Sequence, residues 1–183
     1  PDGISPRSKL GLENGVFWNT GDESDEYGHI SEDPVNRIQM MDKRQTKVEQ
    51  MLSLIPKDDQ AVAYGKLDIC IVSWGSPKGP ILDAIEMHRN EGHEIGFIDI
   101  KLLHPFPTNY IKSMLKDSSI IIDIEANMTG QLASLIRENL LRDPDYYVLK
   151  YTGRPMTCIE IFDSLKKILE KKSEKKQVLT YGD

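Results

Sequence analysis

Four short segments of the sequence carry residue types that could bind an anion. They read GSPKG at 75–79, KLLHPFP at 101–107, ANMTG at 126–130 and YTGRP at 151–155. The first and third each open a predicted helix with small or hydroxyl residues, whose backbone N–H groups would be free to receive an anion. Lysine and arginine side chains would add positive charge. The candidate ligand-binding or interface residues are Ser76, Lys78, Gly79, Asn127, Thr129, Gly130 and Arg154.

The two helix-opening segments differ in how well they suit a phosphate. The segment at 75–79 matches neither G-x-G-x-x-G nor G-x-x-x-x-G-K-[ST]. In addition, Pro77 and Pro80 remove N–H donors that a phosphate would use. We therefore favour a structural turn between a strand and a helix. The segment at 126–130 keeps its donors, but helix capping explains its composition equally well.

No catalytic residue is assigned from the sequence. Glu125 ends an apolar run, at the position where acids of α/β enzymes often act, but no partner acid or base stands at a useful spacing. We expect His88 to border the core and His104 to brace a loop. His29 lies among acids in a loop and could serve a neighbouring site.

The two cysteines do not indicate a metal site. Neither Cys70 nor Cys158 has another cysteine or a histidine nearby at the spacing of metal ligands. We therefore expect no zinc or iron–sulfur cluster to be held by this chain, and no other metal. Both residues are expected to be reduced thiols within apolar runs, as is usual in the cytoplasm.

Charge and hydropathy argue against two classes of partner. The formal net charge is −6, whereas proteins that bind nucleic acid or anionic membranes present a positive surface. No apolar stretch approaches the roughly 20 residues of a membrane-spanning helix. The first residues also lack the apolar core of a secretory signal. We expect a cytoplasmic protein that binds neither nucleic acid nor membrane.

A sheet is needed to bring the candidate segments together. Between helical patterns lie short runs rich in Ile and Val that are apolar on both faces, at 68–74, 95–100, 119–125 and 147–150. Thr157 and Glu160 open the last helix as a capping-box pair. Strands buried on both faces that alternate with helices predict an α/β domain with a mainly parallel sheet flanked by helices, over residues 67–170. Ligands of such sheets lie beyond the carboxyl ends of the strands.

The remainder of the chain is expected to be less compact. Residues 1–33 are rich in turn formers and acids and have no apolar face, so we expect a mostly irregular segment that continues from a longer protein. Asp33 and Pro34 start a long helix with one narrow apolar stripe, which Pro56 ends. We assign 44–66 to a linker helix and loop. The lysine-rich residues 171–183 are predicted to form a flexible basic tail.

The order of these segments resembles a known family. WGSPKGPILDAIEMHRNEGHEIGFIDIKLLHPFP, then IIIDIEANMTGQLASLIRENL, then LKYTGRPMTCIEI, is similar to the C-terminal part of the alpha subunit of 2-oxoacid:ferredoxin oxidoreductases. The upstream DEYGHISEDPVNRIQMMDKR resembles the segment that leads out of the preceding domain of that subunit. More distantly, 67–170 resembles the transketolase C-terminal domain.

The resemblance implies a thiamine-diphosphate enzyme of 2-oxoacid (pyruvate or 2-oxoglutarate) metabolism. Such enzymes oxidatively decarboxylate a 2-oxoacid, transfer the acyl group to coenzyme A and pass electrons through an iron–sulfur cluster to ferredoxin. The thiamine-side motif of the alpha subunit, of the form Tyr-Pro-Ile-Thr-Pro, is absent here. The substrate-associated stretch of the Gly-Pro-Ser-Thr-Gly type is absent too. In this family the beta subunit holds the diphosphate, the magnesium and the cluster, so none of these cofactors is expected on this chain alone.

The family places this chain in a structural role. Its partners would be the rest of the alpha subunit and the beta subunit, with ferredoxin and coenzyme A acting on the whole enzyme. Residues 1–43 would be the remnant of a pyrimidine-binding-type domain. Two alternatives stay open: a stand-alone module that binds an adenine-containing ligand such as coenzyme A through 75–79 and 126–130, and an interaction protein that uses the helix at 34–55.

Overall fold

The structure is a computed structural model that describes residues 3–17 and 19–180. It divides into two compact units, residues 1–55 and 56–183. The division falls at Ile55, directly after helix α1 (Pro34–Leu54). The boundary that we expected at residue 43 lies inside this helix.

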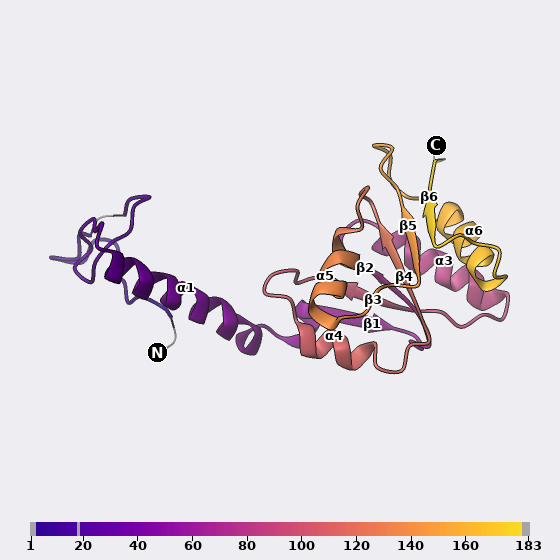
Figure 1. Cartoon of the computed structure of the whole chain (residues 1–183), viewed down its shortest axis with the longest axis horizontal. Helices are drawn as coiled ribbons and strands as arrows, with labels where there is room; N and C mark the ends of the chain where they lie inside the picture. Colours follow the sequence, from indigo (N-terminus) through magenta and orange to yellow (C-terminus); the bar gives the residue numbers. More distant parts are fainter. Residues whose placement is uncertain (1–2, 18, 181–183) are drawn as a thin grey trace. The chain divides into compact units, whose positions relative to one another are not determined.

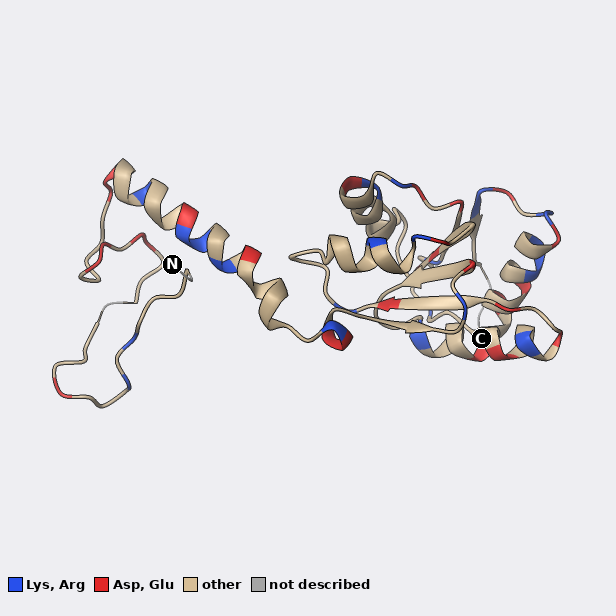
Figure 2. Cartoon of the chain, turned by 90° about the horizontal axis from the view of Figure 1, so that it is seen from below, with Lys and Arg blue, Asp and Glu red and all other residues tan. Residues whose placement is uncertain are grey.

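Helix α1 begins as the sequence predicts. The Oδ1 atom of Asp33 accepts a hydrogen bond from the backbone N–H of Val35 at 2.9 Å, and Pro34 occupies the first turn, where no N–H is needed. The helix ends at Leu54, two residues before Pro56. Basic and acidic residues both occur along its length (Figure 2).

Polar contacts rather than a core hold the first unit together. The carboxylate of Glu23 accepts hydrogen bonds from Arg37 at 2.8 Å and from Arg44 at 2.6 Å. The hydrogen bond from Arg44 is the main reason that the pKa of Glu23 falls to about 2. None of residues 3–17 and 19–55 is buried. The predicted apolar stripe is accordingly exposed to solvent, since Ile38 and Met41 are 63% and 49% exposed.

The second unit is a six-stranded sheet with helices on both faces, which confirms the predicted α/β class (Figure 1). The sheet order is β1-β3-β2-β4-β5-β6, with β1 antiparallel to β3 and every other pair parallel. The strands are β1 (Ala61–Tyr64), β2 (Ile69–Ser73), β3 (Gly96–Ile100), β4 (Ile120–Glu125), β5 (Tyr146–Leu149) and β6 (Lys176–Val178). The helices are α2 (Lys57–Gln60), α3 (Lys78–Asn90), α4 (Thr108–Met114), α5 (Gln131–Leu140) and α6 (Cys158–Leu169).

Each face of the sheet has its own apolar core because both sets of alternating side chains are mostly apolar. Ile71, Phe97 and Ile122 face α3 and α6, and pack against residues such as Ile85 and Leu165. The opposite face packs against α4 and α5. Its buried members are Ala61, Cys70, Val72, Ile98, Ile100, Phe106, Ile111, Leu115, Ile121, Leu132 and Ile136.

The sheet extends beyond the predicted domain range of 67–170 at both ends. β1 lies in the segment that we expected to be a linker. β6 lies in the segment that we expected to be a flexible tail, where Tyr147 N–H donates to the carbonyl of Lys175 and Leu179 N–H to that of Leu149, both at 2.8 Å. The expectation of a flexible tail is therefore wrong for 176–179. Leu179, directly after β6, is only 8% exposed, but the lysines before it, a residue type common on edge strands, masked this signal in the sequence.

His88 borders the core between α3 and α6, as expected. The side chain is fully buried and stacks on Phe162 at 4.3 Å between ring centroids, while its Nε2 lies 3.0 Å from the Phe162 carbonyl oxygen. Because the carbonyl can only accept, Nε2 carries the proton and donates. Burial is the main cause that lowers the pKa of His88.

The buried His88 should make the stability of the chain depend on pH. With its folded pKa below the unfolded value of about 6.5, the unfolded state binds the proton more readily, so the stabilisation is present above pH 6.5 and is lost as the pH falls below it. We expect His88→Gln to flatten the pH dependence of the free energy of unfolding between pH 5 and 7. Urea titration of the 183-residue chain measures this. The exposed His93→Gln is the control, and equal slopes for the wild type and the His88 variant would contradict the assignment.

Candidate functional site

The carboxyl ends of β2, β4 and β5 bring the sequence-predicted segments to one edge of the sheet. Glu125 ends β4 and is almost fully buried, at 1% exposure. Its Oε2 accepts a hydrogen bond from Trp74 Nε1 at 2.9 Å and another from Asn127 Nδ2 at 2.8 Å. The loop after β2 and the loop after β4 are therefore joined through one carboxylate.

The same carboxylate caps helix α5. Leu132 N–H lies 2.9 Å from Glu125 Oε1, and Ala133 N–H lies 3.2 Å from the same oxygen. A negative charge at this position also interacts favourably with the positive end of the helix. Glu125, the acid that the sequence places at a strand end, is thus a structural cap whose oxygens are occupied.

The backbone N–H groups at the end of the loop at 126–130 donate to a side chain of the same loop. Asn127 Oδ1 accepts from the backbone N–H groups of Thr129 at 3.2 Å, Gly130 at 2.8 Å and Gln131 at 3.4 Å. Gly130 has φ +67°, a left-handed conformation that glycine adopts without strain. The helix-capping interpretation of this segment is therefore the one that the geometry supports, because Asn127 occupies the position that an anion would take.

The segment at 75–79 is a turn, and the ammonium group of its lysine already forms an ion pair within the chain. Lys78 Nζ lies 2.8 Å from Asp99 Oδ2, and this hydrogen bond raises the pKa of Lys78. Lys78 N–H is 3.4 Å from the Gly75 carbonyl. Ser76 and Gly79 are exposed. A structural strand-to-helix turn thus describes this segment better than a phosphate loop.

A buried ion pair that the sequence did not reveal anchors the loop after β5. The Lys150 side chain is fully buried, and its Nζ donates to Glu160 Oε2 at 2.7 Å and to the Pro155 carbonyl at 2.8 Å. Glu160 also completes the predicted capping box with Thr157. Burial works to raise the pKa of Glu160, but the hydrogen bonds from Lys150 and Thr157 outweigh it and lower that pKa. Arg154 lies exposed in the loop that this pair fixes.

Asp123 is the second feature that sequence reasoning missed. It lies two residues before Glu125 on the same face of β4 and is fully buried. Neither of its carboxyl oxygens has a hydrogen-bond partner within normal geometry among residues 3–17 and 19–180. Burial, together with the charge of Glu125, raises the pKa of Asp123 to about 9. The side chain is therefore a neutral carboxylic acid at pH 7.

An apolar pocket of about 360 Å³ opens beside this network. Its walls are Trp74, Leu103, Leu132 and Leu135, with the polar side chains of Thr129, Gln131 and Ser134 at its border. Such a lining can enclose an apolar group but contains no acid or base, and the Ser134 hydroxyl already donates to the Gly130 carbonyl at 3.0 Å. His104 is exposed in the loop after β3, and His29 lies in the first unit, 3.6 Å from Asp25.

The described part of the chain holds no cluster of three or more His, Cys, Asp or Glu residues that could bind a metal ion. Burial raises the pKa of the Cys70 thiol to about 12, and Cys158 begins a different element, α6. Across the described ranges, no helix is both long and apolar enough to cross a bilayer.

Comparisons with known proteins agree with the fold and with the order of the segments. Residues 67–161 match the family described as pyruvate:ferredoxin oxidoreductase core domain II. The chain is 42% identical to 2-oxoacid:ferredoxin oxidoreductase 2, subunit alpha, of Aeropyrum pernix and 40% identical to the corresponding subunit of Saccharolobus solfataricus. Both matches cover 99% of this chain but only 28% of the relative.

Two solved structures have a related fold. A 2-oxoglutarate:ferredoxin oxidoreductase from Magnetococcus marinus, with 2-oxoglutarate, coenzyme A and succinyl-CoA bound, matches with a TM-score of 0.78 and 28% identity. The match covers 91% of this chain and 29% of that one. An inactive split-gene transketolase tetramer matches with a TM-score of 0.51 and 21% identity, over 63% of this chain and 43% of that one. The latter likeness concerns the fold alone.

The free energy of unfolding should fall as the pH rises, because Asp123 holds its proton in the folded chain. Because its folded pKa of about 9 exceeds the unfolded value of 3.8, the stabilisation is fully present below pH 3.8 and is lost as the pH rises through 9. The slope is at most about 1.4 kcal/mol per pH unit. We expect Asp123→Asn to remove this slope between pH 4 and 9 in urea titrations, while the exposed Asp117→Asn keeps it. Parallel pH curves for the wild type and Asp123→Asn would show that Asp123 is ionised in the folded chain.

Proposed function

The chain belongs to the pyruvate:ferredoxin oxidoreductase core domain II family, and from this we propose that it is the C-terminal portion of the alpha subunit of a thiamine-diphosphate-dependent 2-oxoacid:ferredoxin oxidoreductase. The whole enzyme would oxidise a 2-oxoacid to its acyl-coenzyme A and pass the electrons to ferredoxin. Support comes from relatives named as alpha subunits, which align with 99% of this chain while the chain spans only 28% of their length.

Within that enzyme we assign this chain a structural role in assembly. The observation that carries the assignment is the network around Glu125. At this sheet edge, where α/β enzymes usually bind ligands, the acid, the amide of Asn127 and the first N–H groups of α5 bond to one another. A site whose polar groups are already paired within the chain offers little to a reacting substrate.

The residues of this chain do not fit the cofactors of the whole enzyme. Magnesium requires several oxygen ligands and an iron–sulfur cluster requires several thiolates. Neither set is gathered in the described ranges 3–17 and 19–180. We therefore propose that thiamine diphosphate, magnesium and the cluster are held by other parts of the enzyme, such as the beta subunit.

The first unit favours a chain that continues into a preceding domain. None of the described residues 3–17 and 19–55 is buried. This unit therefore lacks the buried apolar surface that would offset the entropy cost of folding on its own. We propose that residues 1–43 complete a pyrimidine-binding-type domain of the same subunit. The two free cysteines are consistent with a reducing, cytoplasmic location.

The alternative of a stand-alone adenine-binding module has weaker support. Its expected cradle used the loops at 75–79 and 126–130, and in both the groups meant for phosphates are engaged, Lys78 by Asp99 and Gly130 N–H by Asn127. The pocket beside Trp74 would still take an apolar ring. Calorimetric titration of this chain with coenzyme A distinguishes the two functions, since the structural role predicts no heat at millimolar ligand.

Removal of the second unit should abolish assembly of the oxidoreductase. We expect an alpha subunit that ends at Ile55 not to co-purify with the beta subunit, and ferredoxin reduction by 2-oxoacid to be lost with it. In the complete enzyme, Glu125→Gln should reduce the yield of complex but leave the turnover of assembled enzyme within about threefold. Loss of a general acid would instead cost about 100-fold or more. Normal assembly and turnover of the truncated enzyme would refute the structural role.

A further inference from the structure

An exposed turn in the first unit carries an asparagine that is followed by a glycine. Gly15 N–H donates to the carbonyl of Leu12 at 3.0 Å and closes a turn over Glu13 and Asn14. Asn14 is exposed and has φ +58°, a left-handed conformation that asparagine tolerates better than most residues with a side chain. Of the seven asparagines in the sequence, Asn14 alone precedes a glycine.

An asparagine before a glycine contains both groups of an intramolecular displacement reaction. The backbone nitrogen of the following residue can attack the side-chain carbon Cγ of the asparagine and close a five-membered ring. A side chain on that following residue hinders the attack, and glycine has none. Asparagine is also among the thermolabile residue types. The chain therefore favours this reaction at Asn14 over its other asparagines.

The turn itself requires the glycine. A Cβ atom at Gly15 would lie 3.0 Å from the Leu12 carbonyl oxygen and 3.0 Å from Ser8 Cβ. The Ser8 hydroxyl also donates a hydrogen bond to the Gly15 carbonyl. A larger residue would have to displace these neighbours, so the close packing that forms the turn also keeps the attacking nitrogen unhindered.

The side-chain amide of Asn14 is not held in place, in contrast to the amides of Asn36 and Asn127. Within the part of the chain that the structure describes, the Asn14 side chain forms no hydrogen bond. Asn36 Nδ2 donates to the Ser24 carbonyl at 3.2 Å, and Asn127 Nδ2 donates to Glu125 at 2.8 Å. The Asn14 side chain can therefore rotate its Cγ toward the next backbone nitrogen.

The hydrogen bond of the attacking nitrogen is an obstacle that opens easily. Gly15 N–H must leave the Leu12 carbonyl before its nitrogen can attack, and water can replace this bond because Leu12 is 60% exposed. None of the described residues of the first unit is buried, so no packed core resists the opening of the turn. The reaction should therefore proceed in the folded chain at close to its rate in an unstructured peptide.

We propose that Asn14 is a site of spontaneous, non-enzymatic deamidation. The Gly15 nitrogen gives its proton to hydroxide and bonds to Asn14 Cγ, while the Cγ–Nδ2 bond breaks and Nδ2 takes a proton from water and leaves as ammonia. Water then opens the cyclic imide at one of its two carbonyl carbons, which gives aspartate or isoaspartate.

Water is the co-reactant of this conversion, and nothing is oxidised or reduced. The product carries one more negative charge than the parent chain, whose formal net charge is −6. In the isoaspartate product the main chain runs through Cγ, so the turn becomes one atom longer. The proposal does not depend on the enzyme to which the chain belongs.

The test compares the 183-residue chain with the free peptide of residues 10–17. Both are incubated at pH 8 and 37 °C, and the fragment that contains Asn14 is analysed by mass spectrometry, with isoaspartate separated by chromatography. We expect this fragment to gain the mass difference between an amide and an acid, at a rate within about tenfold of that of the peptide. The rate should rise with pH, because hydroxide removes the proton from the attacking nitrogen.

Two variants provide the controls. Asn14→Gln should keep its mass, because glutamine would have to close a less favourable six-membered ring. Met128→Gly places a second asparagine before a glycine, but Asn127 accepts backbone N–H groups and donates to Glu125. Asn127 in this variant should therefore deamidate at least tenfold more slowly than Asn14. Circular dichroism verifies that each variant is folded.

Three results would overturn the proposal. The first is a rate at Asn14 in the chain more than about 100-fold below that of the peptide, which would show that the turn protects the amide. The second is a rate that does not change with pH, which would exclude attack by the deprotonated nitrogen. The third is equal conversion of Asn14 and Asn127 in Met128→Gly, which would show that the fold does not select the site.

Discussion

The buried carboxylate of Glu125 is the interaction on which the carboxyl edge of the sheet depends. It accepts hydrogen bonds from the Trp74 indole, the Asn127 amide and the first free N–H groups of α5. A buried charge is tolerated only where such donors replace the water it has lost. With these donors in place, the charge fixes two loops and the start of one helix relative to β4. The walls of the apolar pocket beside Trp74 follow from this arrangement.

Asp123 and Glu125 show how two buried carboxyl groups on one strand face differ in their surroundings. Glu125 accepts hydrogen bonds from backbone and side-chain donors, whereas neither carboxyl oxygen of Asp123 has such a donor within the described part of the chain. Burial and the neighbouring Glu125 carboxylate raise the pKa of Asp123 to about 9. Two ionised carboxylates side by side in a low-dielectric interior would repel each other strongly, and the raised pKa of Asp123 avoids that repulsion at neutral pH.

The sequence predicted the features that depend on local pattern. Alternating apolar runs and helices identified the α/β class, and Asp33 and the Thr157–Glu160 pair marked two helix starts because capping is a local interaction. Features that depend on distant partners were not predictable. Lys150 appears as a polar end to a strand until Glu160 is seen beside it, and the edge strand β6 is hidden among lysines. The sequence indicated backbone N–H donors at 126–130. That Glu125 and Asn127 accept the hydrogen bonds at this helix start could be seen only in the structure.

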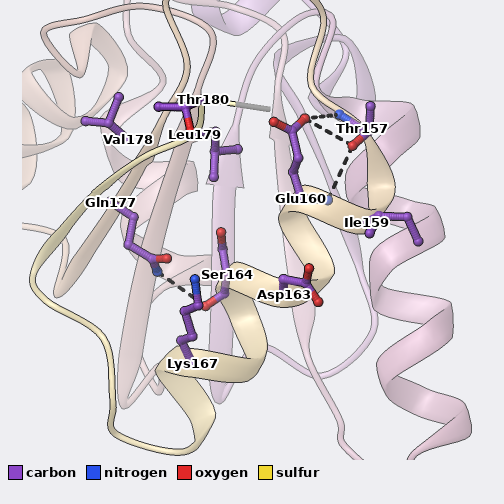
Figure 3. A pocket seen from close by; sticks show the side chains of 10 residues that line it. All are labelled: Thr157, Ile159, Glu160, Asp163, Ser164, Lys167, Gln177, Val178, Leu179 and Thr180. Carbon is purple, nitrogen blue, oxygen red and sulfur yellow. Dashed lines mark hydrogen bonds between the residues drawn. The ribbon is translucent and has the colours of Figure 1, made fainter. Parts of the chain in front are cut away.

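The different burial of the two thiols has a practical consequence for spectroscopy. Cys70 is inside the sheet, and its high pKa leaves almost no thiolate to react at neutral pH. Cys158 is partly accessible at the first turn of α6, between Thr157 and Ile159, which line a pocket between α6 and β6 (Figure 3). A thiol-reactive fluorophore or spin label would therefore attach to the native chain at a single point beside this pocket. The molecule thus has a built-in reporter position, which requires no substitution.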